Sequence, residues 1–181
     1  MEPFTYANGD LDGNGEWTTP GGLGTLDVVT NRAVLEQTFQ CGNENPLASI
    51  PFDLTLPWSM EWNTTHGLSG GATADTSTQF KAGAQTVQLH IEATNSTADV
   101  SILDATGIAN PLGNFSTAGT VTWKLVWDGA DLIAFRNGTE IGRTVGADIT
   151  GIENLCQIGG TCSDDTKPWR WLDIRVDHPP L

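Results

Sequence analysis

Two strong hairpin signals lie close together in the segment VTWKLVWDGADLIAFRNGTEIGRTV, residues 121–145. Asp128-Gly129 and Asn137-Gly138 separate three runs that are rich in strand-forming residues. Asp-Gly and Asn-Gly pairs supply the positive φ angles of a type I′ turn, whose twist matches that of the strands it joins. The segment therefore predicts a three-stranded antiparallel meander.

The first strand of this meander has one apolar face. Every second residue from Val121 to Trp127 is apolar, and Thr122 and Lys124 lie between them. Because successive side chains of a strand point to opposite faces, we expect one face to meet a core and the other largely water. Trp123 and Trp127 are therefore expected in the core, together with Trp17 and Trp171.

The rest of the chain also consists of short strand-like runs. The 181 residues include 21 Gly and 9 Pro, and turn signals recur about every eight to twelve residues. Further strands are expected at 26–30, 33–40, 52–56, 59–62, 87–91, 100–103 and 169–177. Without helices to cover a sheet, such strands bury their apolar faces against each other. We predict an all-β fold, a two-sheet antiparallel β-sandwich that forms a single domain over residues 1–181.

Two polar segments are predicted to be long loops. Residues 65–78 have no apolar period, and residues 157–168 are rich in Gly, Thr and Asp. Long loops in compact domains are often functional, so these two are candidates for contacts with a partner.

The side chains of the last strand, residues 169–177, are expected to alternate between its two faces. One predicted face carries Trp169, Trp171, Asp173, Arg175 and Asp177, and the other carries Leu172, Ile174 and Val176. The second set is expected in the core.

The charge of the chain excludes several partners. Eight Lys and Arg stand against 22 Asp and Glu, which gives a formal net charge of −14. Such a chain repels a phosphate backbone and an anionic membrane surface, so neither is an expected partner. Membrane insertion is not expected either, because the sequence nowhere has about 18 successive apolar residues. The N-terminal sequence has no basic segment followed by an apolar run, so we expect no signal peptide.

The three cysteines do not form a metal-binding pattern. Cys156 and Cys162 flank QIGGT, a gap that a hairpin could close into a disulfide, whereas Cys41 has no evident mate. Because no export signal is expected, the reduced state is the favoured prediction.

Three segments carry a resemblance to a known superfamily. FTYANGDLDGNGEWTTPGGLGTLDVVTNRAVL, WKLVWDGADLIAFRNGTEIGRTV and RWLDIRVD resemble the first strands, the meander and the closing strand of concanavalin A-like, laminin-G-like jelly rolls. The resemblance covers nearly the whole chain and implies a jelly-roll sandwich. This superfamily includes lectins, glycanases, adhesion modules and phage virion proteins, so it does not imply one activity.

Catalytic patterns are weak. Retaining β-glucanases of this fold carry Glu-x-Asp-x-Glu on one strand, because alternate positions project into one cleft, and this triplet is absent. The nearest acids are Glu61, which is isolated, and the pair Asp173 and Asp177, which Arg175 interrupts. We therefore expect no enzyme, and glycoside hydrolysis is the less favoured alternative.

The histidines support the same expectation. His66, His90 and His178 fall in a predicted loop, a predicted strand and the C-terminal tail, and no nucleophile motif accompanies them. They are expected to be structural or solvated.

The run DLDGNG is similar to half of a calcium loop. Asp10, Asp12 and Asn14 supply oxygen ligands at the first, third and fifth positions, but Gly21 stands where a bidentate Glu is needed. The favoured interpretation is an Asx-rich turn whose side chains bond their own backbone. No cofactor is expected, and calcium on these three residues is the alternative.

Sugar recognition requires an exposed aromatic ring with polar groups beside it. The best candidates are Trp58, which follows Pro57, and Trp169, which follows Asp164 and Asp165 in SDDTKPWRW. Burial of both tryptophans in the core is the favoured interpretation, and sugar binding is the alternative.

The leading hypothesis is a non-enzymatic protein of a phage virion surface, made in the host cytoplasm, where it decorates or cements the capsid or serves in tail-associated adhesion. The expected partners are other virion proteins, further copies of the same chain and a cell-surface glycan. The alternative is a stand-alone, lectin-like carbohydrate-binding protein.

Overall fold

The computed structural model describes the backbone of residues 9–10, 25–28, 33–36, 47–51, 57–65, 74–82, 85–93, 96–152, 155–162 and 169–177. Side-chain environments are described for residues 57–64, 87–93 and 96–152. No helix that is long and apolar enough to cross a membrane is found in the described residues.

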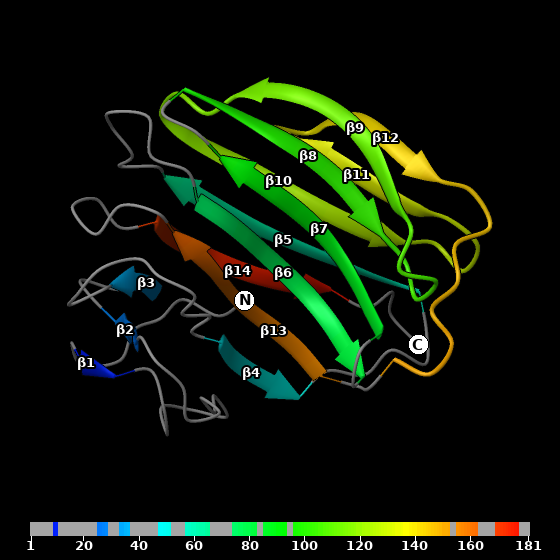
Figure 1. Ribbon diagram of the computed structural model, residues 1–181, viewed down its shortest axis with the longest axis horizontal. Helices are drawn as coiled ribbons and strands as arrows, with labels where there is room; N and C mark the ends of the chain where they lie inside the picture. The colour runs from blue at the N-terminus through cyan, green and yellow to red at the C-terminus, as the bar shows by residue number, and fades with distance from the viewer. Residues whose placement is uncertain are drawn as a thin grey trace.

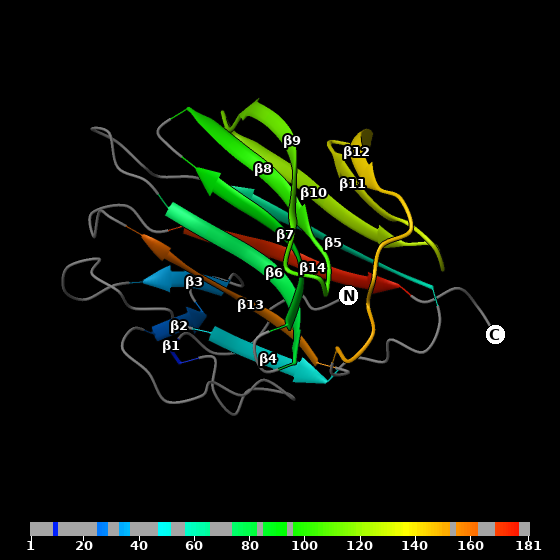
Figure 2. The same cartoon turned by 45° about the vertical axis from the view of Figure 1, so that its right-hand side comes forward.

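The protein is all-β in its described part, and its strands form two antiparallel sheets (Figures 1 and 2). The eight-stranded sheet has the order β1-β2-β3-β14-β5-β10-β11-β12, and the six-stranded sheet has the order β4-β13-β6-β7-β8-β9. The strands of the larger sheet are β1 (Gly9–Asp10), β2 (Thr25–Val28), β3 (Ala33–Glu36), β14 (Trp169–Asp177), β5 (Trp58–Thr65), β10 (Thr120–Trp127), β11 (Leu132–Arg136) and β12 (Thr139–Thr144). Those of the smaller sheet are β4 (Leu47–Pro51), β13 (Leu155–Cys162), β6 (Ala74–Ala82), β7 (Gln85–Ala93), β8 (Thr97–Leu103) and β9 (Ala109–Ser116). The predicted two-sheet sandwich is thus confirmed.

The core lies between the two sheets, because alternating apolar residues of each sheet face the other. In the larger sheet Trp62 of β5 lies directly opposite Trp123 of β10, and both are buried. In the smaller sheet Val87, Leu89 and Ile91 are buried at every second position of β7, as their spacing predicts. The same alternation turns the intervening polar residues of β7 outward.

The meander is confirmed, but its two turns differ. Asn137 and Gly138 both have positive φ, at 49° and 77°, as a type I′ turn requires. At Asp128-Gly129 the strand pairing ends with Trp127 opposite Leu132, so the loop has four residues, 128–131. The type I′ turn predicted there is wrong, because the Asp128 carboxylate accepts hydrogen bonds from the backbone N–H groups of Ala130 and Asp131 and so stabilises a wider Asx turn.

Both predicted long loops are shorter than expected. Strand β5 continues to Thr65 and β6 begins at Ala74, so residues 65 and 74–78 are strand, whereas residues 66–73 lie outside the described residues. Likewise Gln157–Cys162 belongs to β13, which pairs with β4 and β6 on its two sides. Small and polar residues such as Thr, Ser, Asp and Gly are frequent in these segments, and pairing with neighbouring strands overrides this loop-like composition.

The disulfide considered for Cys156 and Cys162 is excluded by the same strand. Both cysteines belong to β13, with six residue steps between them. A strand rises about 3.3 Å per residue, so their Cα atoms are about 20 Å apart, whereas a disulfide needs about 4.4–6.8 Å. No hairpin forms at QIGGT.

Two further predictions need correction. Trp127 is only half-buried, at the end of β10 beside the open loop, whereas Val121, Trp123 and Leu125 are fully buried as predicted. In β14 a register shift between Leu172 and Arg175 interrupts the pairing with β5. A bulge of this kind interrupts the strict alternation of side chains between the two faces of a strand. The two faces predicted for residues 169–177 therefore do not extend along the whole of β14. Trp17 lies outside the described residues, as does the side chain of Trp171.

Candidate functional site

The tryptophans predicted to bind sugar do not form a site in the described residues. Trp58 begins β5 and is 2% exposed, so its ring cannot serve as a stacking platform. The sugar-binding role considered for Trp58 is wrong and the favoured burial is confirmed, because the alternation of β5 turns Trp58 inward together with Met60 and Trp62. Trp169 opens β14 opposite Leu35, but its side chain, Asp164 and Asp165 lie outside the described residues.

The predicted calcium half-loop is described in one position only. Asp10 lies in β1 opposite Asp27, whereas Asp12 and Asn14 lie outside the described residues. Within the residues that the structure describes, no group of three or more His, Cys, Asp or Glu side chains could hold a metal ion. The calcium hypothesis stays a prediction.

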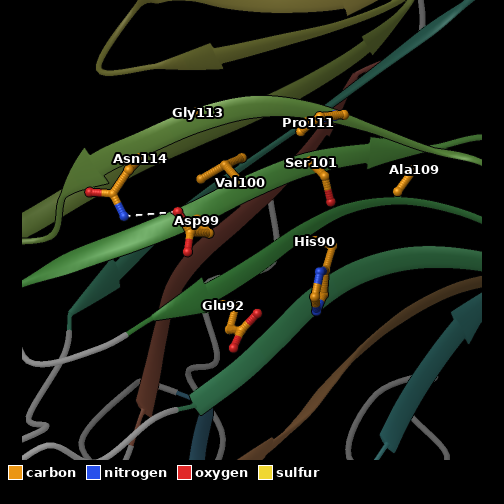
Figure 3. A pocket seen from close by; sticks show the side chains of 9 residues that line it. All are labelled: His90, Glu92, Asp99, Val100, Ser101, Ala109, Pro111, Gly113 and Asn114. Carbon is orange, nitrogen blue, oxygen red and sulfur yellow. Dashed lines mark hydrogen bonds between the residues drawn. The ribbon is translucent and has the colours of Figure 1, made fainter.

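A pocket of about 450 Å³ lies on the outward face of the six-stranded sheet (Figure 3). Strands β7, β8 and β9 contribute its walls, and the lining residues are His90, Glu92, Asp99, Val100, Ser101, Ala109, Pro111, Gly113 and Asn114. His90 lies directly opposite Ser101, and Glu92 lies directly opposite Asp99. The pocket therefore gathers polar groups that the alternation of these strands turns away from the core.

An irregularity in β9 brings Asn114 into this pocket. Val100 pairs with Gly113 but Ser101 pairs with Pro111, so Leu112 is an extra residue in β9. Because a shift of one residue inverts the faces of a strand, the bulge lets both Pro111 and Asn114 lie on the outward face. Asn114 then donates from Nδ2 to Oδ1 of Asp99 at 2.8 Å. Gly113 adopts φ of 129° at this point, which favours glycine.

The pocket is acidic. Glu92 and Asp99 are both exposed, and none of the described residues that line the pocket is Lys or Arg. The two arginines whose side chains are described have contacts elsewhere. Arg143 contacts Glu140 at 2.8 Å and Asp131 at 3.2 Å, and Arg136 donates to the backbone oxygen of Ser116.

Among the residues whose side chains are described, three acids outside the pocket have lowered pKa values. Hydrogen bonds from the backbone N–H groups of Asp131 and Ala130 lower the pKa of Asp128. The guanidinium of Arg143 lowers the pKa of Glu140 through its hydrogen bonds, and bonds from Thr150 lower that of Asp148. These contacts stabilise the loops of the larger sheet and its edge strand β12, not the pocket.

The alternation of residues in the sequence indicated part of this site, although no sequence motif did. Gln88, His90 and Glu92 alternate with buried residues, so their outward orientation was predictable. His90 was expected to be structural or solvated, and the structure places it half-buried in the pocket. The contributions of Asp99 and Asn114 required the strand pairing and the bulge. Among the less favoured catalytic candidates, Glu61 lies on the other sheet opposite Lys124 and Arg175.

No protein-family model and no curated protein matches the sequence. Solved structures do resemble the fold. The chain matches the Emp46p carbohydrate recognition domain in its potassium-bound form with TM-score 0.68 and 10% identity, over 100% of this chain and 96% of that one. A sialidase matches with TM-score 0.64 and 8% identity over 95% of this chain, which spans only 18% of the sialidase. The PL7 alginate lyase AlyA1 from Zobellia galactanivorans matches with TM-score 0.56 and 12% identity, over 90% and 94% of the two chains.

At these identities the likeness concerns the fold. It confirms an antiparallel jelly-roll sandwich, a fold that the chain shares with a carbohydrate recognition domain and an alginate lyase. The neighbours include both a binding domain and enzymes, so function must be argued from the pocket.

Proposed function

We propose that the protein is a non-catalytic, lectin-like glycan-binding protein whose ligand lies in the pocket over β7, β8 and β9. The observation that carries the proposal is the convergence of His90, Glu92, Asp99, Ser101 and Asn114 on one hollow of about 450 Å³. Pockets of about 300–1,000 Å³ with a few convergent polar groups are typical ligand sites.

The chemistry of the lining suits sugar hydroxyls. The carboxylates of Glu92 and Asp99 accept hydrogen bonds, whereas the side chains of Ser101 and Asn114 both donate and accept. Pro111 and Ala109 add small apolar surfaces against which the C–H face of a sugar ring can pack. The neighbour that matches the chain over nearly its full length is named as a carbohydrate recognition domain, which supports this class of ligand.

Glycoside hydrolysis is the second candidate, because Glu92 and Asp99 face each other across β7 and β8. Residues directly opposite have Cβ atoms about 5 Å apart, and retaining glycosidases hold two carboxyl groups about 5–5.5 Å apart. Both carboxylates are exposed, however, whereas a catalytic acid is usually kept protonated by an apolar pocket. We therefore expect binding without turnover.

A glycan array tests the proposal. Wild-type protein is expected to show saturable binding to a defined set of glycans, and His90→Ala and Ser101→Ala are expected to weaken it. Trp169→Ala serves as a comparison, because Trp169 was the sequence-based candidate. Circular dichroism must show that each variant keeps its strand content.

The outcomes separate the hypotheses. Binding that is lost in the pocket variants and kept in Trp169→Ala supports the pocket. Binding that is kept in the pocket variants and lost in Trp169→Ala would place the site at Trp169. The absence of binding to any glycan refutes the proposal. Release of reducing ends or unsaturated products from a bound polysaccharide, abolished by Glu92→Gln, makes the protein an enzyme instead.

The surface of a phage particle is the proposed place of this function. The acidic charge suits docking on a basic virion protein, and repetition of the chain over a lattice would raise avidity for a cell-surface glycan. Mass spectrometry of purified particles tests this role through the presence and copy number of the chain.

Calcium titration of wild type and Asp12→Ala tests the predicted site at Asp10, Asp12 and Asn14.

A further inference from the structure

We infer that the pocket selects glycans that carry amino groups and rejects polyanionic ones. This inference rests on the proposed glycan-binding function and adds the charge class of the ligand. Its basis is the pair of carboxylates, Glu92 and Asp99, in a hollow whose described lining contains no Lys or Arg (Figure 3).

The strand pairing holds the two carboxylates together. Glu92 of β7 and Asp99 of β8 are directly opposite, and both lie on the outward face. Like charges in this arrangement repel each other and destabilise the sheet. An ammonium group placed between them would remove this repulsion, so the site gains more from a cation than a single surface carboxylate would.

Asn114 orients one of the two carboxylates. Its amide donates to Oδ1 of Asp99 at 2.8 Å, across the neighbouring strands β8 and β9. A carboxylate accepts about four hydrogen bonds, of which this amide takes one. Asp99 is therefore held in place while it keeps the capacity to accept from an ammonium group, which has only donors.

The rest of the molecule strengthens the charge preference. The chain carries 22 acidic residues against eight Lys and Arg. In the described part of the chain Lys124, Arg136, Arg143, Arg170 and Arg175 belong to the larger sheet. Lys81 belongs to β6 of the smaller sheet, and none of these six residues lines the pocket. A polyuronate such as alginate would bring further carboxylates to an acidic surface, so it is a poor ligand although alginate lyases share the fold.

Calorimetry with three oligosaccharides of equal length tests the inference. The probes are a β-1,4-glucosamine hexamer, its N-acetylated counterpart and an alginate hexamer. The glucosamine hexamer should bind about tenfold more tightly than the acetylated one at low salt, and the difference should shrink as salt screens the charges. The alginate hexamer should bind most weakly.

Variants separate the pocket from the acidic surface as a whole. Glu92→Gln and Asp99→Asn each keep the size of the side chain and should reduce the preference for the glucosamine hexamer about threefold to tenfold. Glu61→Gln is the matched control, because it removes one negative charge from the outer face of the other sheet. It should leave the preference unchanged.

The results distinguish the inference from the function on which it rests. Equal affinity for the amino and the acetylated hexamer, unchanged in Glu92→Gln, overturns the charge selection while glycan binding stands. Tightest binding of the alginate hexamer also overturns it, as does an equal loss of preference in Glu61→Gln. If no hexamer and no glycan on the array binds, the inference falls together with the proposed function.

Discussion

The buried hydrogen bond between Trp123 and Thr64 offers a quantitative test of the packing between β5 and β10. Trp123 donates from Nε1 to Oγ1 of Thr64 at 2.9 Å, and both residues are 0% exposed. Thr64→Val keeps the shape of the side chain and removes the acceptor. The indole N–H is then buried without a partner, which costs about 1–3 kcal/mol.

The expected loss of stability is thus about 2 kcal/mol for Thr64→Val. For a domain of this size each kcal/mol shifts the melting temperature by about 2–4 °C. In a Trp123→Phe background there is no indole N–H to leave unpaired. The same Thr64→Val substitution should then cost less than about 0.5 kcal/mol, and the difference is the coupling energy.

Urea unfolding of the four proteins in this cycle measures the coupling, provided that the slope of the transition is the same for all. Thr139→Val, at an exposed position in β12, is the control and should change stability by less than about 0.5 kcal/mol. An equal cost of Thr64→Val in both backgrounds would refute the reasoning, because the loss would then not depend on the indole N–H.

Two further predictions concern the turns and the edge of the larger sheet. Asn137→Ala should destabilise the protein by about 1–2 kcal/mol in urea unfolding, because Asn137 has φ of 49° and its Oδ1 accepts from the N–H of Thr122. Asn137→Gly should cost less, and an equal cost would contradict the role of φ. Acid should also destabilise the fold: Asp128 and Glu140 have lowered pKa values when folded, so their contribution is complete above the unfolded pKa of about 4 and is lost as pH falls through the folded pKa. Melting temperatures between pH 7 and pH 2 measure this, and Asp128→Asn should flatten the curve.

The local sequence determined the strands with regular apolar alternation, such as β7 and β10, together with much of the core and one turn of this protein. It did not determine β6 and β13, which were predicted in large part as loops. Val87, Leu89 and Ile91 alternate with polar residues, and the pleat of a strand leaves such a pattern only one way to face a core. Asn137-Gly138 likewise specifies its turn, since both residues tolerate positive φ. These features depend on neighbours in the chain, so a sequence pattern is sufficient to predict them.

The tertiary structure alone decided the candidate site. Trp58 was a candidate sugar platform by composition, and it is buried because the larger sheet turns the face of β5 that carries Trp58, Met60 and Trp62 toward the other sheet. Glu92, Asp99 and Asn114 meet because β7, β8 and β9 pair in one particular register and β9 contains a bulge. Register is set by many packing contacts between distant segments, and a shift of one residue would turn these side chains inward. No local pattern records that choice, which is why the acidic pocket became visible only in the folded chain.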